Sequence, residues 1–374
     1  MSIVAGWKKG KLHEYIELIS GQHIDANDYN TEGVGTPYLT GPSDFSEGKI
    51  VATKFTERPK TVCKKGDILI TVKGSGVGKT VVSDNEYCIS RQLMAIRPTD
   101  QLRGIIYYTL KNVEQRYNSD SAGLIPGISR ADILNTTINF PIDNRESEKI
   151  GEILSLWDKA IELKQKLIDQ KKVQKKGLMQ KLLTGKVGLP GFEGEWEEIQ
   201  VQDICTLSRG RVISKKEMSE KSGPYPVYSS QTSENGEIGS IDTYDFEGEY
   251  VTWTTDGANA GTVFYRNGKF NCTNVCGVLQ LQRKDLDARY FSYILQASTD
   301  KYVVRHGNPK LMNNIMGIIP LKIFNNYKYQ KVVCDFFDEV NREIHLLERE
   351  VNELMCQKKG LMQLLLTGKV RVKV

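Results

Sequence analysis

The clearest pattern of hydrophobic and polar residues lies in two long segments, one in the middle of the chain and one at its end. In both, hydrophobic residues recur at alternating spacings of four and three, the heptad seam by which one α-helix pairs with another. We therefore predict two long helices, each of which needs a partner. The residues expected to pair them are Ile150, Leu154, Trp157, Ile161 and Ile168 in the first and Val333, Phe337, Val340, Ile344, Leu347, Val351 and Leu354 in the second.

Polar residues in the seam are lysines: Lys358 in the second segment, and Lys164, Lys171 and Lys175 in the first. Each segment ends in "TGKV", whose glycine is a natural helix stop. Globular sequence separates the two helices, so the simplest pairing is antiparallel. About 35 residues at 1.5 Å each would make a rod of roughly 50 Å. A plain structural coiled coil would also fit the helices taken alone.

The remaining sequence consists of short, β-branched hydrophobic runs between turns. "TVVSDNEYCISRQLMAI" is typical, because it carries turn residues and no 3.6-residue period. The predicted fold class is α+β, with two strand-rich mixed domains alternating with two long helices that pair as an antiparallel coiled coil. The predicted boundaries are 1–146 for the first domain, 147–187 for the central helix, 188–327 for the second domain and 328–374 for the C-terminal helix.

The chain is an internal repeat. "QKKGLMQKLLTGKV" at 174–187 recurs as "QKKGLMQLLLTGKV" at 357–370, identical at 13 of 14 positions with an offset of 183. Fainter matches run through both domains: "WKKGKLHEYIELISG" answers "WEEIQVQDICTLSRG" at an offset of 189, and the glycines of "KGSGVGKT" answer those of "DGANAG" at 183. Each domain and its helix therefore form one unit that is written twice.

Composition is that of a globular protein, with 39% hydrophobic and 26% charged residues, and 374 residues suggest two or more domains. No run of 18 apolar residues occurs, and no apolar stretch follows a basic N-terminus, so we expect no membrane span, no secretory signal and a cytoplasmic location. Seven scattered cysteines suit free thiols in a reducing compartment. Cys272 and Cys276 lack the second Cys/His pair that would complete a zinc site.

The net charge of +5 is mild but unevenly distributed. Between Lys164 and Lys186 there are eight lysines and a single acid, Asp169. Such a basic stripe can mark nucleic acid or an acidic partner surface, and a solvated helix face is the alternative.

The stretch "TVKGSGVGKTVV" ends like a phosphate-binding loop, G-x-x-x-x-G-K-[ST]. The leading glycine of that motif would fall at Lys73, and the residues after Thr80 read as a strand where the motif requires a helix. Its counterpart "DGANAG" has no Lys-Thr pair. We therefore predict a glycine turn between two strands, and a nucleotide hydrolase using Lys79 and Thr80 is the weaker alternative.

Catalytic patterns are otherwise missing from the sequence. The four histidines (His13, His23, His306, His345) show neither metal-ligand spacing nor a triad. No G-x-G-x-x-G heads a strand–helix–strand unit, and no Asn/Asp-Pro-Pro-aromatic tetrapeptide marks an amino-methyltransferase. The chain reads as a binding protein.

This organisation closely resembles the specificity subunit of type I restriction–modification systems over the whole chain. The duplicated "KKGLMQ" helix tails, the "GW" and "GEW" domain openings and the stretch "YPVYSSQTSENGEIGSIDTYDFEGEYVTWTTDGANAG" carry the resemblance. It implies two target recognition domains that each read one half of a bipartite DNA site in the major groove. It further implies that the antiparallel helices set the spacing between half-sites and dock two methyltransferase subunits, which nuclease and translocase subunits join.

In that family the specificity subunit catalyses nothing. The resemblance thus implies no cofactor on this chain, and S-adenosylmethionine, ATP and magnesium would belong to partner subunits. The two domains differ in their turn residues, so different half-sites are expected.

Candidate DNA-contacting residues follow from their positions in turns next to strands, and an ordinary loop role is the alternative for each. In the first domain they are Thr40, Ser43, Asp44, Lys73, Ser75, Lys79, Arg91, Gln92 and Arg130. In the second they are Ser229, Ser230, Gln231, Thr255, Asp256, Asn259, Asn274, Arg305, His306 and Lys310. A coiled-coil scaffold without DNA readout is the remaining alternative for the whole chain.

Overall fold

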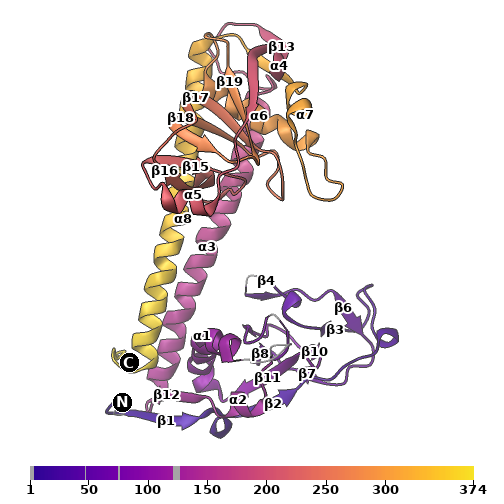
Figure 1. Cartoon of the computed structure of the whole chain (residues 1–374). Coiled ribbons are helices and arrows are strands. Elements are labelled where there is room, and N and C mark those ends of the chain that lie inside the picture. The colour runs from indigo at the N-terminus through magenta and orange to yellow at the C-terminus, as the bar shows by residue number, and fades with distance from the viewer. Residues whose placement is uncertain (1–3, 47, 75, 121–126) are drawn as a thin grey trace. The chain divides into compact units, whose positions relative to one another are not determined.

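The computed structural model describes residues 4–46, 48–74, 76–120 and 127–374 and divides into two compact units (Figure 1). Unit 1 comprises Met1–Lys164 and Glu350–Val374, and unit 2 comprises Gln165–Arg349. The long helices are α3 (Asn144–Leu182) and α8 (Tyr327–Leu366). Each unit therefore combines one strand-rich domain with part of both helices.

In unit 1 the strands form two four-stranded sheets and two pairs. One sheet has the order β2-β11-β8-β9 and is antiparallel, and the other has the order β6-β3-β10-β7 with β3 and β10 parallel. The pairs are β1–β12 and β4–β5. The bounds are β1 Trp7–Lys11, β2 Ile16–Ser20, β3 Thr36–Leu39, β4 Phe45–Ser46, β5 Lys49–Ile50, β6 Lys54–Thr56, β7 Val62–Cys63, β8 Ile68–Thr71, β9 Thr80–Val82, β10 Tyr87–Ile89, β11 Leu93–Pro98 and β12 Thr137–Pro141.

Helices cover the main core of unit 1. They are α1 (Arg103–Asp120), α2 (Arg130–Leu134) and the start of α3, and short 3₁₀ turns join the strands at Leu12–Glu14, Ala26–Asp28, Pro42–Asp44 and Asp100–Leu102. Helices α1 and α3 approach closely where glycine faces glycine: a Cβ added to Gly104 would lie 2.6 Å from Cα of Gly151. The buried core combines strand residues such as Ile70 with Ile105 of α1.

In unit 2 one mixed six-stranded sheet has the order β14-β19-β17-β18-β15-β16, and β13 pairs with β20. Helix α6 packs on this sheet with Tyr290 and Phe291 fully buried. The bounds are β13 Trp196–Gln200, α4 Val201–Ile204, β14 Cys205–Arg209, α5 Lys215–Glu220, β15 Tyr225–Tyr228, β16 Glu237–Ile241, β17 Phe246–Thr254, β18 Val263–Cys272, β19 Cys276–Leu281, α6 Ala288–Thr299, α7 Asn313–Gly317 and β20 Pro320–Phe324. Further 3₁₀ turns lie at Ser233–Gly236 and Asp300–Tyr302.

Within each unit α3 and α8 run antiparallel, as contacts between them show. In unit 1 Lys358 of α8 bonds Asp158 of α3, and Lys164 bonds Glu350. In unit 2 Lys171 pairs with Glu343 at 2.7 Å, and the hydroxyl of Tyr329 on α8 donates to the carbonyl of Leu182 on α3 at 3.1 Å. Residue numbers rise on one helix as they fall on the other, so the antiparallel coiled coil expected from the sequence is confirmed.

The seam residues predicted to pair the helices differ in how deeply they are buried. Ile150, Leu154, Ile168, Val333, Phe337, Ile344 and Val351 are buried, whereas Trp157, Ile161, Val340, Leu347 and Leu354 are half-buried. The ends of the seam also enter the domain cores: Ile150 and Leu154 belong to the core of unit 1, and Val333 and Phe337 to that of unit 2.

The near-identical helix tails perform the same packing twice. Leu182 and Leu183 belong to the core of unit 2, and their equivalents Leu365 and Leu366 belong to the core of unit 1. The glycine that ends each tail lies against the tryptophan of the first strand of the domain: a Cβ on Gly185 would lie 2.6 Å from Trp196, and one on Gly368 would lie 2.9 Å from Trp7. The leucines and the glycine that the two tails share thus make equivalent contacts in the two units.

The glycine turn is a connection between strands, as the sequence predicted. Gly74 and Gly78 have φ values of +91° and +86°, and Thr80 begins strand β9, which pairs with β8. Gly257 and Gly261 repeat these values at +94° and +86°. A helix does not follow Thr80, so the phosphate-binding-loop alternative has no structural basis.

Candidate nucleic-acid interface

Three turns that are far apart in the sequence of unit 1 come together where strands β3, β8 and β10 end. Strands β3 and β10 are parallel neighbours, with Leu39 opposite Ile89, so the segments that follow them emerge side by side. Strands β8 and β11 are antiparallel, with Thr71 opposite Leu93, which brings the glycine turn to the same place. We call residues 40–44, 73–74, 76–79 and 90–92 the turn cluster of unit 1.

Direct contacts hold this cluster together. A Cβ added to Gly41 would lie 2.5 Å from Oε1 of Gln92, and one added to Gly76 would lie 2.5 Å from Pro42. The hydroxyl of Ser90 donates to the carbonyl of Thr40 at 2.8 Å. The turns are therefore packed as one surface.

The predicted residues of this cluster differ in accessibility. Ser43, Lys73, Lys79, Arg91 and Gln92 are exposed, and Thr40 is half-buried. Asp44 is only 4% exposed, and its Oδ2 accepts hydrogen bonds from the amides of Thr40 and Gly41 at 2.6 and 3.0 Å. The position of Asp44 therefore suits holding the turn and not reading a base. Ser75 lies outside the described residues.

Unit 2 repeats the arrangement residue for residue. Tyr228 lies opposite Cys272 in the parallel β15–β18 pair, as Leu39 does opposite Ile89, and Thr254 lies opposite Cys276, as Thr71 does opposite Leu93. The turn hydrogen bonds also recur: the amide of Gly78 donates to Thr71 at 2.8 Å, and that of Gly261 donates to Thr254 at 2.8 Å. Residues 229–231, 255–262 and 273–275 thus form the turn cluster of unit 2.

Side-chain bonds connect the turns of this second cluster. The hydroxyl of Thr273 donates to that of Ser229 at 2.9 Å, and Nδ2 of Asn259 reaches the carbonyl of Ser230 at 3.4 Å. Of the predicted residues, Asn259 and Asn274 are exposed, whereas Ser229, Ser230, Gln231 and Asp256 are half-buried and Thr255 is fully buried. The structure therefore brings together all the predicted turn residues of this domain.

Asp256 lies at the centre of a network of ion pairs, of which the sequence predicted Asp256 and Lys310 but not Arg209. Its carboxylate pairs with Arg209 at 3.3 Å and with Lys310 at 3.9 Å, and its Oδ2 accepts from the Thr255 hydroxyl. Arg209 was missed by the sequence analysis. The available signal was the repeat, because Arg209 precedes Gly210 where Ser20 precedes Gly21 in the first half.

In each domain the short helix α2 or α7 contacts the second strand, β2 or β14. In the first domain the arginine of this contact lies on the helix, whereas Arg209 of the second domain lies on the strand. Arg130 donates to the hydroxyl of Ser20 at 2.7 Å and to the carbonyl of Leu18 at 3.0 Å. Asn313, the repeat equivalent of Arg130, donates to the carbonyl of Ser208 at 3.3 Å. Each domain thus holds one guanidinium group at this contact, on helix α2 in the first domain and on strand β14 in the second.

The remaining predicted cations of unit 2 lie on the segment before α7. Arg305 pairs with Asp300 at 2.6 Å, and His306 is exposed. The backbone of Lys310 forms one β-bridge with that of Asp256 and another with that of Val304. Only Lys310 of these three therefore reaches the turn cluster directly.

A second arginine absent from the predictions lies beneath the turn cluster of unit 2. Arg266 is 3% exposed, and its guanidinium carbon lies 3.5 Å from the ring centroid of Tyr228, while Nε reaches the hydroxyl of Thr252 at 3.2 Å. Burial lowers the pKa of Arg266. The side chain supports the loop after β15 through this cation–π contact.

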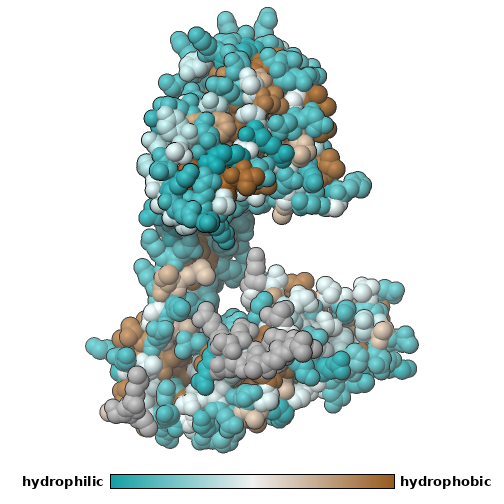
Figure 2. Space-filling view, viewed as in Figure 1, coloured by the Kyte–Doolittle hydropathy of each residue, from teal (hydrophilic) through white to brown (hydrophobic). Residues whose placement is uncertain are grey.

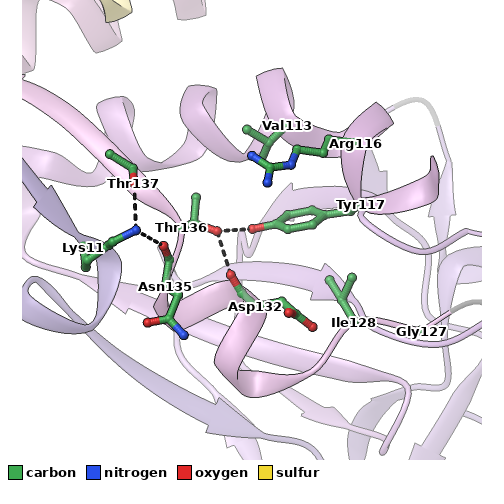
Figure 3. Close-up of a pocket in the computed structure, with 10 residues that line it drawn as sticks. All are labelled: Lys11, Val113, Arg116, Tyr117, Gly127, Ile128, Asp132, Asn135, Thr136 and Thr137. Carbon is green, nitrogen blue, oxygen red and sulfur yellow. Dashed lines mark hydrogen bonds between the residues drawn. The ribbon is translucent and has the colours of Figure 1, made fainter. Parts of the chain in front are cut away.

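The cavity shown in Figure 3 lies between α1, α2 and the β1–β12 pair and has a volume of about 420 Å³. Its polar groups bind one another: Nζ of Lys11 donates to Asn135 and Thr137 at 2.7 and 2.9 Å, and the hydroxyls of Tyr117 and Thr136 are hydrogen-bonded. Desolvation raises the pKa of Tyr117. The cavity is therefore a structural polar network and not an acid–base pair.

Among the described residues, no group of three or more His, Cys, Asp or Glu side chains could hold a metal ion. The cysteines are free, and all but Cys356 are buried. Helices in the described ranges are all too short or too polar to span a membrane. The turn clusters thus present hydrogen-bonding and cationic side chains.

A tandem of two equivalent strand-rich domains, each presenting one turn cluster and each joined to a shared pair of long helices, defines a duplicated binding protein. The family model described as type I restriction modification DNA specificity domain matches residues 5–171 and again 193–355. The chain therefore belongs to the family of type I restriction–modification specificity subunits.

Relatives agree with this assignment. A chain from Mycoplasma pneumoniae named as a type I specificity subunit is 32% identical over 247 residues, 62% of this chain and 90% of its own length. Another from the same organism, named as the N-terminus of such a subunit, is 46% identical over 140 residues, 37% of this chain and 74% of its own. The crystal structure of a type I system S subunit from M. genitalium shares the fold, with a TM-score of 0.63 at 17% identity over 98% of this chain and 97% of that one.

Proposed function

We propose that this chain is the non-catalytic DNA-reading subunit of a type I restriction–modification complex, in which each turn cluster reads one half of a bipartite site in the major groove. The observation that carries the proposal is the duplication of the turn cluster with an identical strand register. Equivalent strand pairings that present different side chains suit two readers of different half-sites.

The chemistry of the exposed residues supports this reading. The first cluster presents Lys73, Lys79, Arg91 and Gln92, and the repeat equivalents of the first three are Asp256, Thr262 and Asn274. Arginine and lysine match the O6 and N7 acceptors of guanine or a phosphate, whereas asparagine matches N6 and N7 of adenine. The two halves should therefore prefer different bases.

The paired helices supply candidate docking surfaces for methyltransferase subunits. Leu163 on α3 and Leu346 on α8 are equivalent in the repeat and are 55% and 51% exposed. Figure 2 shows hydrophobic residues among the hydrophilic ones along the visible face of the helices. Exposed leucines at equivalent positions support the docking of two like subunits, one on each half.

In this proposal S-adenosylmethionine, ATP and magnesium are bound by the partner subunits, the nuclease and translocase join the methyltransferase, and the complex acts in the cytoplasm. The proposal is tested by mapping methylated adenines across the genome of the source cell with and without this chain. We expect one bipartite motif to lose its methylation when the chain is removed. Unchanged methylation would favour a coiled-coil scaffold without DNA readout.

A further inference from the structure

The helix pair of unit 1 contains a half-buried lysine that has a carboxylate partner. Nζ of Lys358 donates to Asp158 and lies 5.2 Å from the ring centroid of Tyr108. The Tyr108 hydroxyl donates to the same carboxylate at 2.7 Å. Only 17% of the Lys358 side chain is exposed, so a carboxylate and an aromatic ring together replace the water that this ammonium has lost.

Unit 2 keeps the lysine but lacks the carboxylate. In the repeat Lys175 corresponds to Lys358, and Asn341 corresponds to Asp158. Nδ2 of Asn341 donates to the hydroxyl of Tyr293 at 2.9 Å. The neighbouring Asp338 accepts from Arg289 at 3.0 Å and from Tyr293. Within the part of the chain that the structure describes, half-buried Lys175 therefore makes no hydrogen bond or ion pair.

Lys175 and Asn341 line a cavity of about 730 Å³ in unit 2. Three further lysines line it as well: Lys172, Lys176 and Lys301. Its two carboxylates already have partners, because Asp300 pairs with Arg305 at 2.6 Å and Glu348 pairs with Lys172 at 2.7 Å. The lining of the cavity thus contains more lysines than carboxylates.

Burial lowers the pKa of Lys175, the nearby Asp338 carboxylate acts against this effect, and the charge of Lys172 acts with it. The protein therefore holds a cation where the charged form is disfavoured, although the equivalent position of unit 1 carries a counterion. A bound anion would supply the missing charge.

We propose that this cavity binds a small phosphorylated ligand, with its phosphate between Lys175, Lys176 and Lys301. Lysines are compact point charges, and several of them lining one cavity suit a tetrahedral polyanion, whereas a planar carboxylate is matched better by an arginine fork. The volume is that of a small-molecule site, and Met179, Ala297 and Ile344 provide an apolar wall for an organic portion. Thr262 of the turn cluster also lines this cavity, but the ligand proposed here is a small molecule and not DNA.

Isothermal titration of the full chain with inorganic pyrophosphate at low salt tests the proposal. We expect one saturable site whose affinity falls at least about tenfold in Lys175→Gln, because one of three phosphate-facing charges is lost. Asn341→Asp should weaken binding to a similar degree while retaining every lysine, since it restores the carboxylate that neutralises the equivalent lysine in unit 1. Lys159→Gln removes an exposed charge on α3 outside the cavity and should bind as the wild type does.

Thermal unfolding of each variant establishes that it is folded before its affinity is compared. The absence of a saturable site, or equal affinity in the wild type, Lys175→Gln and Asn341→Asp, would overturn the proposal. Competition by duplex DNA, together with a smaller salt dependence of DNA binding in Lys175→Gln, would instead assign the cavity to a DNA phosphate and would also overturn it.

Discussion

Arg91 and Asn274 occupy equivalent backbone positions in the two turn clusters, and both side chains are exposed. A guanidinium reads guanine through two hydrogen bonds, and a carboxamide reads adenine in the same manner. A comparison of Arg91 with Asn274 therefore tests the effect of side-chain chemistry at a constant backbone position.

We expect Arg91→Ala to relax base preference in the first half-site alone and Asn274→Ala in the second alone, by about 1–3 kcal/mol at one base pair. Methylation mapping of the reconstituted complex on a library of sites measures both. Lys79→Ala serves as the comparison, because a phosphate contact should weaken binding evenly over all sequences. If Arg91→Ala altered the second half-site, the assignment of clusters to half-sites would be wrong.

At the residue scale, the sequence predicted the positions of turns better than the roles of side chains. Thr255 and Asp44 are polar turn residues, yet both are buried and bonded within their turns. Arg209 and Arg266 lie in strands, where alternation suggests solvent-facing residues, and only the tertiary fold brings them to the turn cluster. Solvent exposure of a polar residue depends on contacts between distant segments, which a local pattern does not contain.

At the element scale, the long helices were predictable because the heptad spacing reports a local property of each helix. The sheet order was not, since the parallel pairings of β3 with β10 and of β15 with β18 join strands separated by long stretches of sequence. The repeat could have indicated that both pairings are the same, but not which strands they join. The ends of the seam contact domain residues as well as the other helix for the same reason.

The helix-ending glycines give a prediction at this scale. Gly368 has a φ of +69°, and a side chain there would also meet Trp7, so Gly368→Ala should destabilise unit 1 by at least about 1–2 kcal/mol. Gly360 lies inside α8 with nothing within 4 Å of an added Cβ, so Gly360→Ala should stabilise the helix by up to about 1 kcal/mol. Denaturant unfolding of the two variants checks the opposite signs, and a loss of stability in both would refute the packing argument.

At the scale of the whole molecule, the repeat predicts two equivalent docking sites. Leu163→Glu or Leu346→Glu should each reduce the bound methyltransferase subunits from two to one, because a charge replaces an exposed apolar contact, and the double variant should bind none. Native mass spectrometry of the mixture gives the stoichiometry. Lys159→Glu changes charge on the same helix and should leave two subunits bound; two subunits on both leucine variants would contradict the docking proposal.

The division of the chain into units suggests where its spacing can be changed. Unit 1 ends at Lys164 and resumes at Glu350, so insertions after Gln165 and near Glu348 fall at the border of the units, away from the core of either domain. Four residues add about 6 Å to a helix, the rise of roughly two base pairs. If the helix pair sets the distance between half-sites, one extra turn in both helices should lengthen the non-specific spacer of the methylated site and leave both half-sites unchanged.

Methylation mapping measures the length of the spacer and the sequence of both half-sites in one experiment. An insertion in α3 alone is the control, because it breaks the antiparallel register and should abolish methylation, and altered half-sites with an unchanged spacer would show that the helices do not act as a ruler.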